Sequence, residues 1–129
     1  MMRPAALCRI GVICAALSAA GLAWAQETIT ATVDASGMVT IARGDAPLAV
    51  VELNAHGSTW QHAPQSGATA LSSNLPDRPG KRVEGSLPVP GVDGGAIRFV
   101  ETVRMLTNGL QLEYDLGMSQ TMRLNGLQL

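Results

Sequence analysis

The turn signal Asn108-Gly109 constrains this chain most, because two alternating segments meet at it. Residues 96–107 and 110–116 both alternate apolar and polar side chains. An Asn-Gly pair favours a two-residue hairpin turn in which both central residues have positive φ. The sequence therefore predicts an antiparallel β-hairpin in this part of the chain.

The register of this hairpin follows by counting back from the turn. It places Val103 opposite Tyr114, and Arg104 opposite Glu113 as a cross-strand ion pair. One face of the hairpin is then apolar, with these members: Ile97, Phe99, Val103, Met105, Leu112, Tyr114 and Leu116. Glu101 falls on the same face and interrupts it. A slip of one residue would turn every side chain to the other face.

Other short segments have the composition of strands separated by turns. We expect strands over Thr28–Val33, Met38–Ala42 and Lys81–Val89, because these are rich in β-branched residues or bounded by Gly and Pro. Leu48–Leu53 is apolar enough for a central strand. Together these patterns predict an all-β fold, an antiparallel β-sandwich-like domain.

The stretch from about residue 54 to 80 shows no recognisable strand or helix, and we expect a long loop there or an element that the pattern does not reveal.

Near the carboxyl end, a reversal over Gly117–Thr121 places Met122 against Leu116. The sequence stops at Leu129 inside a strand-like pattern. We therefore expect a sandwich that is either complete with an open edge or incomplete, as in a fragment of a longer protein.

The first 25 residues have the pattern of a secretory signal peptide. Arg3 and Arg9 supply positive charge, Ile10–Leu22 is an uncharged apolar run, and small residues precede a cut after Ala25. This run is short for a bilayer span, which takes about 20 residues. We therefore expect a secreted or periplasmic protein with no stable membrane span after cleavage, and one domain over residues 26–129.

The composition after Ala25 narrows the function classes. Cys8 and Cys14, the two cysteines, lie in the predicted leader, which excludes disulfides, thiol catalysis and Cys-ligated zinc in the exported chain. Removing Arg3 and Arg9 leaves seven basic against ten acidic residues, a formal charge of −3. A mildly acidic chain without a basic cluster is not expected to bind nucleic acid.

Three residues are candidate ligand contacts. His56 and His62 could hold a metal, but no Cys or carboxylate has ligand spacing to them, so we favour exposed loop residues and expect no metal or cofactor. Trp60 could stack on a sugar ring, or it could fill the core beneath the loop, which we favour.

The carboxylates give no catalytic assignment. Glu101, on the apolar face, could have a raised pKa and act as a general acid, but a structural role is the preferred interpretation. Glu113 and Asp115 resemble a glycosidase pair only in number, and two such residues on one strand usually form a solvated face. No nucleophile elbow, phosphate loop or dinucleotide motif is present. We therefore predict no catalytic residue, and no enzyme unless the chain is a fragment of one.

Residues Gly95–Leu129, with the pattern F-x-E-x-V followed by N-G-L-x-L-x-Y-x-L, resemble the N-terminal β-sandwich part of large exported bacterial glycan-processing proteins of the glycoside-hydrolase type. The resemblance covers about a quarter of the chain. It implies an accessory domain beside carbohydrate chemistry, without catalytic residues of its own.

Two functions remain open from the sequence. The first is an exported non-catalytic module, an accessory domain or N-terminal fragment of a carbohydrate-active protein. The alternative is a stand-alone periplasmic structural or interaction protein that pairs an open strand edge with a strand of a partner protein.

Overall fold

The structure, a computed structural model, describes residues 8–15 and 28–129, and within them the chain forms β-strands and one short 3₁₀ turn but no α-helix, as the alternation predicts. The strands are β1 (Cys8–Ala15), β2 (Ile29–Val33), β3 (Val39–Arg43), β4 (Ala46–Val51), β5 (Asn54–His56), β6 (His62–Pro64), β7 (Thr69–Asn74), β8 (Gly80–Pro88), β9 (Ala96–Leu106), β10 (Gly109–Met118) and β11 (Gly126–Gln128), and a 3₁₀ turn, η1 (Gln65–Gly67), follows β6.

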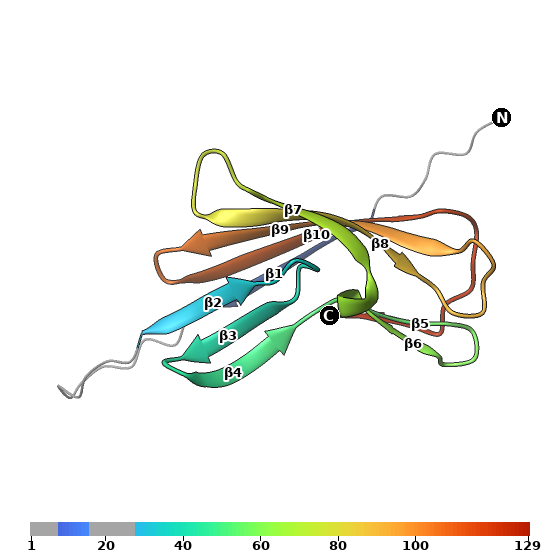
Figure 1. Ribbon diagram of the computed structural model, residues 1–129, viewed down its shortest axis with the longest axis horizontal. Coiled ribbons are helices and arrows are strands. Elements are labelled where there is room, and N and C mark those ends of the chain that lie inside the picture. The colour runs from blue at the N-terminus through green and yellow to red at the C-terminus, as the bar shows by residue number, and fades with distance from the viewer. Residues whose placement is uncertain (1–7, 16–27) are drawn as a thin grey trace.

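These strands form three antiparallel sheets in two layers (Figure 1). The upper layer is a five-stranded sheet in the order β1-β10-β9-β8-β7. The lower layer holds two three-stranded sheets, β2-β3-β4 and β11-β5-β6. This is the predicted β-sandwich-like architecture, with the lower layer divided in two.

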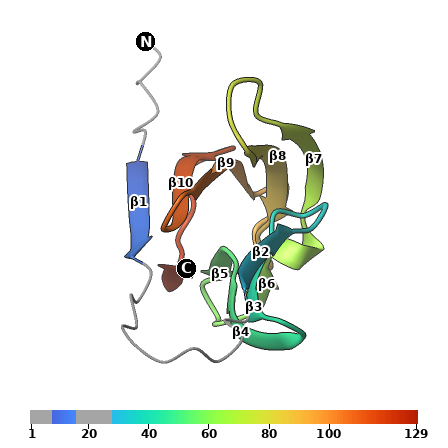
Figure 2. The same cartoon turned by 90° about the vertical axis from the view of Figure 1, so that its left-hand side faces the viewer.

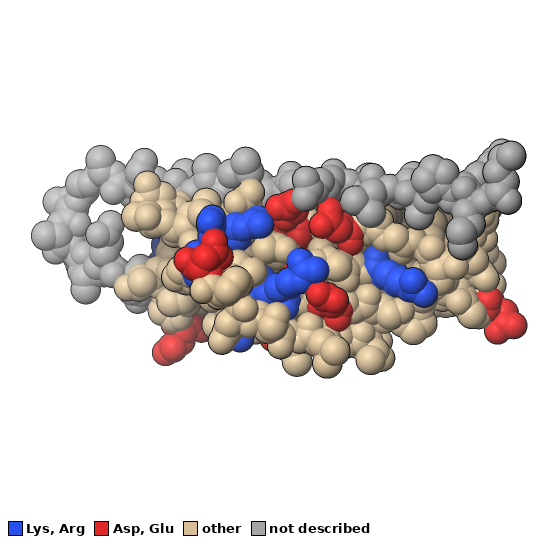
Figure 3. All heavy atoms as spheres, turned by 90° about the horizontal axis from the view of Figure 1, so that it is seen from above, with Lys and Arg blue, Asp and Glu red and all other residues tan. Residues whose placement is uncertain are grey.

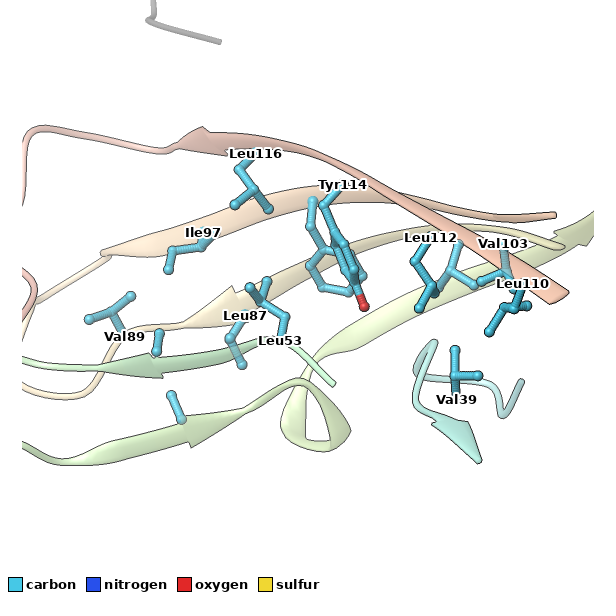
Figure 4. Close-up of a cluster of buried hydrophobic side chains, with 14 residues drawn as sticks. Val39, Leu53, Leu87, Val89, Ile97, Val103, Leu110, Leu112, Tyr114 and Leu116 are labelled. Carbon is cyan, nitrogen blue, oxygen red and sulfur yellow. The ribbon is translucent and has the colours of Figure 1, made fainter. Parts of the chain in front are cut away.

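Figure 2 shows the two layers from another side. The hydrophobic core fills the space between them. Figure 4 shows Leu112 and Tyr114 extending from the upper sheet toward the layer that contains Leu53 and Val39. Full burial of one such apolar side chain contributes about 1.5–3 kcal/mol. The buried core residues are Val39, Leu53, Ala55, Ala63, Val83, Leu87, Val89, Ile97, Phe99, Val103, Leu110, Leu112, Tyr114 and Leu116.

The outer face of the five-stranded sheet carries basic and acidic side chains interspersed with one another (Figure 3). Arg82 Nε lies 2.9 Å from Glu84 Oε1, and Arg104 Nη1 lies 2.9 Å from Glu113 Oε2. The second ion pair was predicted from the alternation. It runs diagonally between the strands, because Arg104 is directly opposite Gln111.

The turn of the β9–β10 hairpin differs from the predicted one. Leu106 pairs with Gly109, so Thr107 and Asn108 are the turn residues. Neither of them has positive φ. The expected Asn108-Gly109 turn is therefore wrong by one position, and Gly109 is the first residue of β10.

Moving the turn by one residue changes the register of the hairpin by two. Glu101, not Val103, lies opposite Tyr114. Side chains in a strand alternate with a period of two, so an even shift leaves each of them on its predicted face. The apolar face was therefore predicted correctly, although the cross-strand partners were not.

The stretch from 54 to 80 is not a long loop. It contains β5, β6, η1 and β7, and β5 pairs antiparallel with β6. Three-residue strands are too short to show an alternation. β7 is mostly polar because it is the outermost strand of its sheet and most of its side chains are exposed.

Two further expectations about strand positions are wrong. The apolar strand β4 is at the margin of its sheet rather than in the centre, with Leu48 and Val50 exposed. The chain after β10 does not return along that strand to place Met122 against Leu116. Instead β11 pairs with β5, and Met122 packs against the core from a segment without strand structure.

The predicted leader and its cleavage after Ala25 fall largely on residues 1–7 and 16–27, outside the described part, and remain a prediction. Of that stretch, the structure describes Cys8–Ala15 as β1, paired antiparallel with β10. Within the described residues, no helix has the length and apolar character needed to cross a bilayer.

Gly85 of β8 tests the packing of the core. It pairs with Phe99, and a Cβ at this position would lie 2.3 Å from Cζ of the Phe99 ring. Because the ring is buried, we expect Gly85→Ala to lower the free energy of unfolding by about 1–3 kcal/mol, measured by urea denaturation.

Gly117 of β10 provides the matched control. A Cβ there would meet no atom within 4 Å. Gly117→Ala should therefore leave stability unchanged or raise it slightly, by restricting the unfolded chain. Equal losses in the two variants would contradict the packing of Phe99 over Gly85.

Candidate functional site

The three predicted ligand contacts come together on the small sheet β11-β5-β6. Ala55 and Ala63 point inward and are buried, so their neighbours Asn54, His56 and His62 are on the outer face. His56 and His62 are register partners on β5 and β6. The register therefore brings together two histidines that are six residues apart in the sequence.

Trp60 lies in the tight turn that joins β5 to β6. Gly57 N donates to Gln61 O at 2.9 Å, and Trp60 N donates to Gly57 O at 2.9 Å. Trp60 has φ of 65°, a left-handed conformation that costs a bulky residue about 1 kcal/mol or more. These bonds fix the backbone of Trp60 at the end of the hairpin.

The preferred prediction for Trp60, a plug in the core, is wrong. Its side chain is 67% exposed, although the turn itself packs against the β8–β9 loop, where a Cβ on Gly57 would lie 2.6 Å from Pro90 O. The other two aromatic residues after Ala25, Phe99 and Tyr114, are both buried. Trp60 is thus an indole that the core does not use.

The three rings adjoin one another in the Trp60–His56–His62 patch, in which Trp60 and His62 are exposed and His56 between them is half-buried. The centroid of the His56 ring lies 5.9 Å from that of Trp60, with the planes tilted by 54°. On its other side, the centroid of the His56 ring lies 5.3 Å from that of His62, stacked at 25°. His56 is the centre of the patch.

Amide side chains orient the two imidazoles. Asn54 Oδ1 lies 2.5 Å from Nε2 of His62, which therefore donates to it. Gln128 Nε2, an amide donor, lies 2.9 Å from Nε2 of His56, and that ring nitrogen is the acceptor of this contact. These contacts place hydrogen-bonding amides around a row of aromatic rings.

The far side of the turn is also tied down. Asn125 Nδ2, just before β11, donates to Ser58 O at 2.6 Å, and the Thr59 hydroxyl donates to Gln61 Oε1. No group of three or more His, Cys, Asp or Glu within residues 8–15 and 28–129 is arranged to hold a metal ion. The chemistry that the patch offers is stacking together with neutral hydrogen bonds.

A second polar cluster lies inside the sandwich, centred on Glu101. Its carboxylate is fully buried and accepts from Gln65 Nε2 at 2.8 Å and from the Tyr114 hydroxyl at 2.9 Å. The Tyr114 oxygen is also 3.1 Å from Gln65 Oε1. This triad was missed because the predicted register placed Val103 opposite Tyr114, and because Gln65 is in the stretch with no predicted element.

The same glutamine connects the triad to the lower layer. Its Nε2 donates to Ser36 O at 2.9 Å, and its Oε1 accepts from Leu53 N at 2.7 Å. Ser36 belongs to the β2–β3 turn, and Leu53 lies between β4 and β5. Gln65 therefore links the upper sheet to both lower sheets.

Burial raises the pKa of Glu101 to about 7, with the charge of Asp34 adding to the rise and the hydrogen bonds from Gln65 and Tyr114 opposing it. The neutral acid also suits the triad. A proton on Oε1 can be donated to Tyr114, whose hydroxyl then donates to Gln65 Oε1. When Glu101 is ionised, the tyrosine proton turns to the carboxylate and that last bond is lost.

The Glu101 triad is a structural element rather than a site for an external substrate. The carboxylate has no exposed surface, and in the described part of the chain every buried side-chain nitrogen or oxygen has a hydrogen-bond partner. Burial, together with the nearby negative charge of Glu101, also raises the pKa of Tyr114. The group that could have acted as a general acid is sealed in the core.

Comparisons with family models, curated proteins and solved structures find no match to this chain.

The pKa of Glu101 predicts how stability depends on pH. The folded-state pKa is about 7, above the ordinary value of 4.5, so the stabilising form is the protonated one. Its contribution is complete below pH 4.5 and is lost as the pH rises to about 7, a total of ~3 kcal/mol. Urea denaturation at half-unit steps from pH 4 to 8 measures this loss.

Glu101→Gln should flatten this dependence, because the amide stays neutral while keeping the shape of the acid. At pH 8 the variant should be more stable than the parent chain. The control is Glu84→Gln, which removes an exposed carboxylate and should leave the slope unchanged. Parallel pH profiles for the parent and Glu101→Gln chains would refute the assignment to Glu101.

Proposed function

We propose that this chain is an exported, non-catalytic module that binds carbohydrate on the Trp60–His56–His62 patch. The observation that carries the proposal is the exposure of Trp60, at 67%, on a hairpin turn fixed by backbone hydrogen bonds. Tryptophan combines a large apolar ring with a polar N–H group, and it is enriched at binding surfaces for that reason.

The surroundings of the indole support a sugar rather than a purely apolar ligand. A pyranose ring offers an apolar face of C–H groups for stacking and a rim of hydroxyls for hydrogen bonds. The patch provides the first contact with Trp60 and the second with the side chains beside it, Gln61, Asn54 and Gln128. The ring of His56 extends the stacking surface.

A non-catalytic role is supported by the position of the carboxylates. Glu101 is sealed inside the sandwich. Glu113 is in the ion pair with Arg104 on the outer face of the upper sheet, away from the patch. The proposal also agrees with the accessory role that the resemblance of residues 95–129 implies.

Pairing of an open strand edge with a partner is the second candidate function. The specific observation in its favour is that the outer edge of β10 is paired only with Cys8–Ala15, a segment inside the predicted leader.

Trp60→Gly tests the patch. The substitution removes the stacking surface and also relieves the left-handed backbone conformation, which glycine adopts freely. We expect loss of binding on a glycan array, with the free energy of unfolding unchanged or raised by about 1 kcal/mol. A core plug would instead lose several kcal/mol.

Leu71→Ala is the matched control, because Leu71 is also a large exposed apolar residue, 81% exposed, but on β7 of the other layer. It should bind glycans as the parent does. If the parent chain binds no glycan on the array, or if both variants lose binding equally, the proposed function is wrong.

Export has its own test. A bacterial periplasmic extract from cells expressing the full chain should contain a protein whose intact mass corresponds to residues 26–129, because Ala25 ends the small-x-small pattern. Replacing Ala25 by Arg should block cleavage and leave the longer form with the membrane fraction. A parent chain that stays in the cytoplasm at full length would contradict export.

A further inference from the structure

The outer edge of β10 is a sheet edge that can accept an added strand. In the structure, eight residues of β1 pair along it, with Ile10 opposite Tyr114 and Val12 opposite Leu112. Figure 2 shows β1 at the margin of the upper layer, beside β10. β10 spans ten residues and is thus longer than β7 at the opposite margin of the sheet, which spans six.

Cleavage after Ala25 would take this covering strand away. β10 would then become an edge strand, with a row of backbone N–H and C=O groups that have lost their partners. The side chains along this edge are large and belong to the core: Leu110, Leu112, Tyr114 and Leu116 are all buried with β1 in place. By contrast, β7 at the opposite margin is short and mostly polar, which makes it a poor edge for pairing with another strand.

We propose that in the exported chain the edge of β10 pairs antiparallel with β10 of a second copy, about a two-fold axis. The proposal rests on the export that is part of the proposed function, but it does not depend on the glycan patch, which lies on a different sheet. The pairing joins two four-stranded sheets into one continuous sheet and covers the β10 edge of each copy, so that only the two β7 strands remain at its margins.

The charge pattern of β10 selects the register of this pairing. An axis centred on Leu112 places that residue opposite its own copy and Glu113 opposite Gln111, with no like charges facing each other. An axis at Glu113 would bring two copies of that carboxylate face to face. An axis at Tyr114 would place Glu113 opposite Asp115. The Leu112-centred pairing also keeps the apolar side chains of both copies on the inner face.

The test uses the exported form, purified after expression of the full chain and identified by intact mass. Sedimentation velocity should show a dimer at micromolar concentration. In the structure, residues 8–15 of the chain pair along this edge. The competitor is therefore a synthetic peptide of these residues, with Cys8→Ser and Cys14→Ser for solubility. Its addition should convert the dimer into monomers, whereas a peptide with the same residues in scrambled order should not.

Two substitutions at one position test the register. Gln111→Glu places like charges opposite each other twice per dimer and should raise the dissociation constant about tenfold, whereas Gln111→Lys should lower it. Within the monomer, Gln111 is opposite Arg104. Gln111→Glu should therefore raise the stability of the monomer and Gln111→Lys should lower it, the reverse of their effects on the dimer. Urea denaturation measures the monomer stability separately.

The outcomes separate this inference from the proposed function. A cleaved chain that stays monomeric up to about 1 mM, or a dimer indifferent to the peptide and to both Gln111 variants, overturns the strand pairing and leaves glycan binding intact. A purified chain whose mass retains residues 1–25 overturns export and the pairing together.

Discussion

The hydrogen bonds among Gln65, Glu101 and Tyr114 are the constraint on which the sandwich depends. An apolar interface between two layers tolerates small sliding movements, because hydrophobic contacts are not directional. Buried polar groups do not tolerate such movements, since each one left without a partner costs about 1–3 kcal/mol. The triad therefore fixes the relative position of the layers, and through the contacts of Gln65 with Ser36 and Leu53 it fixes both lower sheets.

The triad also dictates the backbone that passes beside it. Gly37, in the β2–β3 turn, has φ of 95°, and a Cβ there would lie 2.1 Å from Oε2 of Glu101. Asp34 Oδ1 shapes the same turn by accepting from the backbone N–H groups of Ser36 and Met38. The small sheet β2-β3-β4 can thus approach the carboxylate only because glycine occupies this position. The close approach of the β2–β3 turn helps to exclude water from the carboxyl group of Glu101. This exclusion of water is also the main cause of the raised pKa of Glu101.

The sequence predicts those features of the fold that depend on the alternation of side chains between the two faces of a strand. Alternation around residue 108 gives the buried face of β9 and β10, and even the interior position of Glu101. It cannot give the register, because a shift of two residues leaves the pattern unchanged, and for that reason the pairing of Glu101 with Tyr114 was missed. β5 and β6 were missed because three residues are too few to show alternation.

The patch was found by residue type, but its geometry depends on structure that sequence does not show. His56 and His62 are neighbours only because a tight turn places them in register, and the exposure of Trp60 depends on its position within that turn. Composition suggested the opposite for Trp60, since sugar-binding surfaces often use several aromatic residues and this chain has few. The structure shows instead that Trp60, at φ of 65° in a five-residue reversal, has its side chain exposed to solvent. A bulky indole where glycine would be less strained is a cost to stability, and this cost is one reason to test the patch for the binding that we propose.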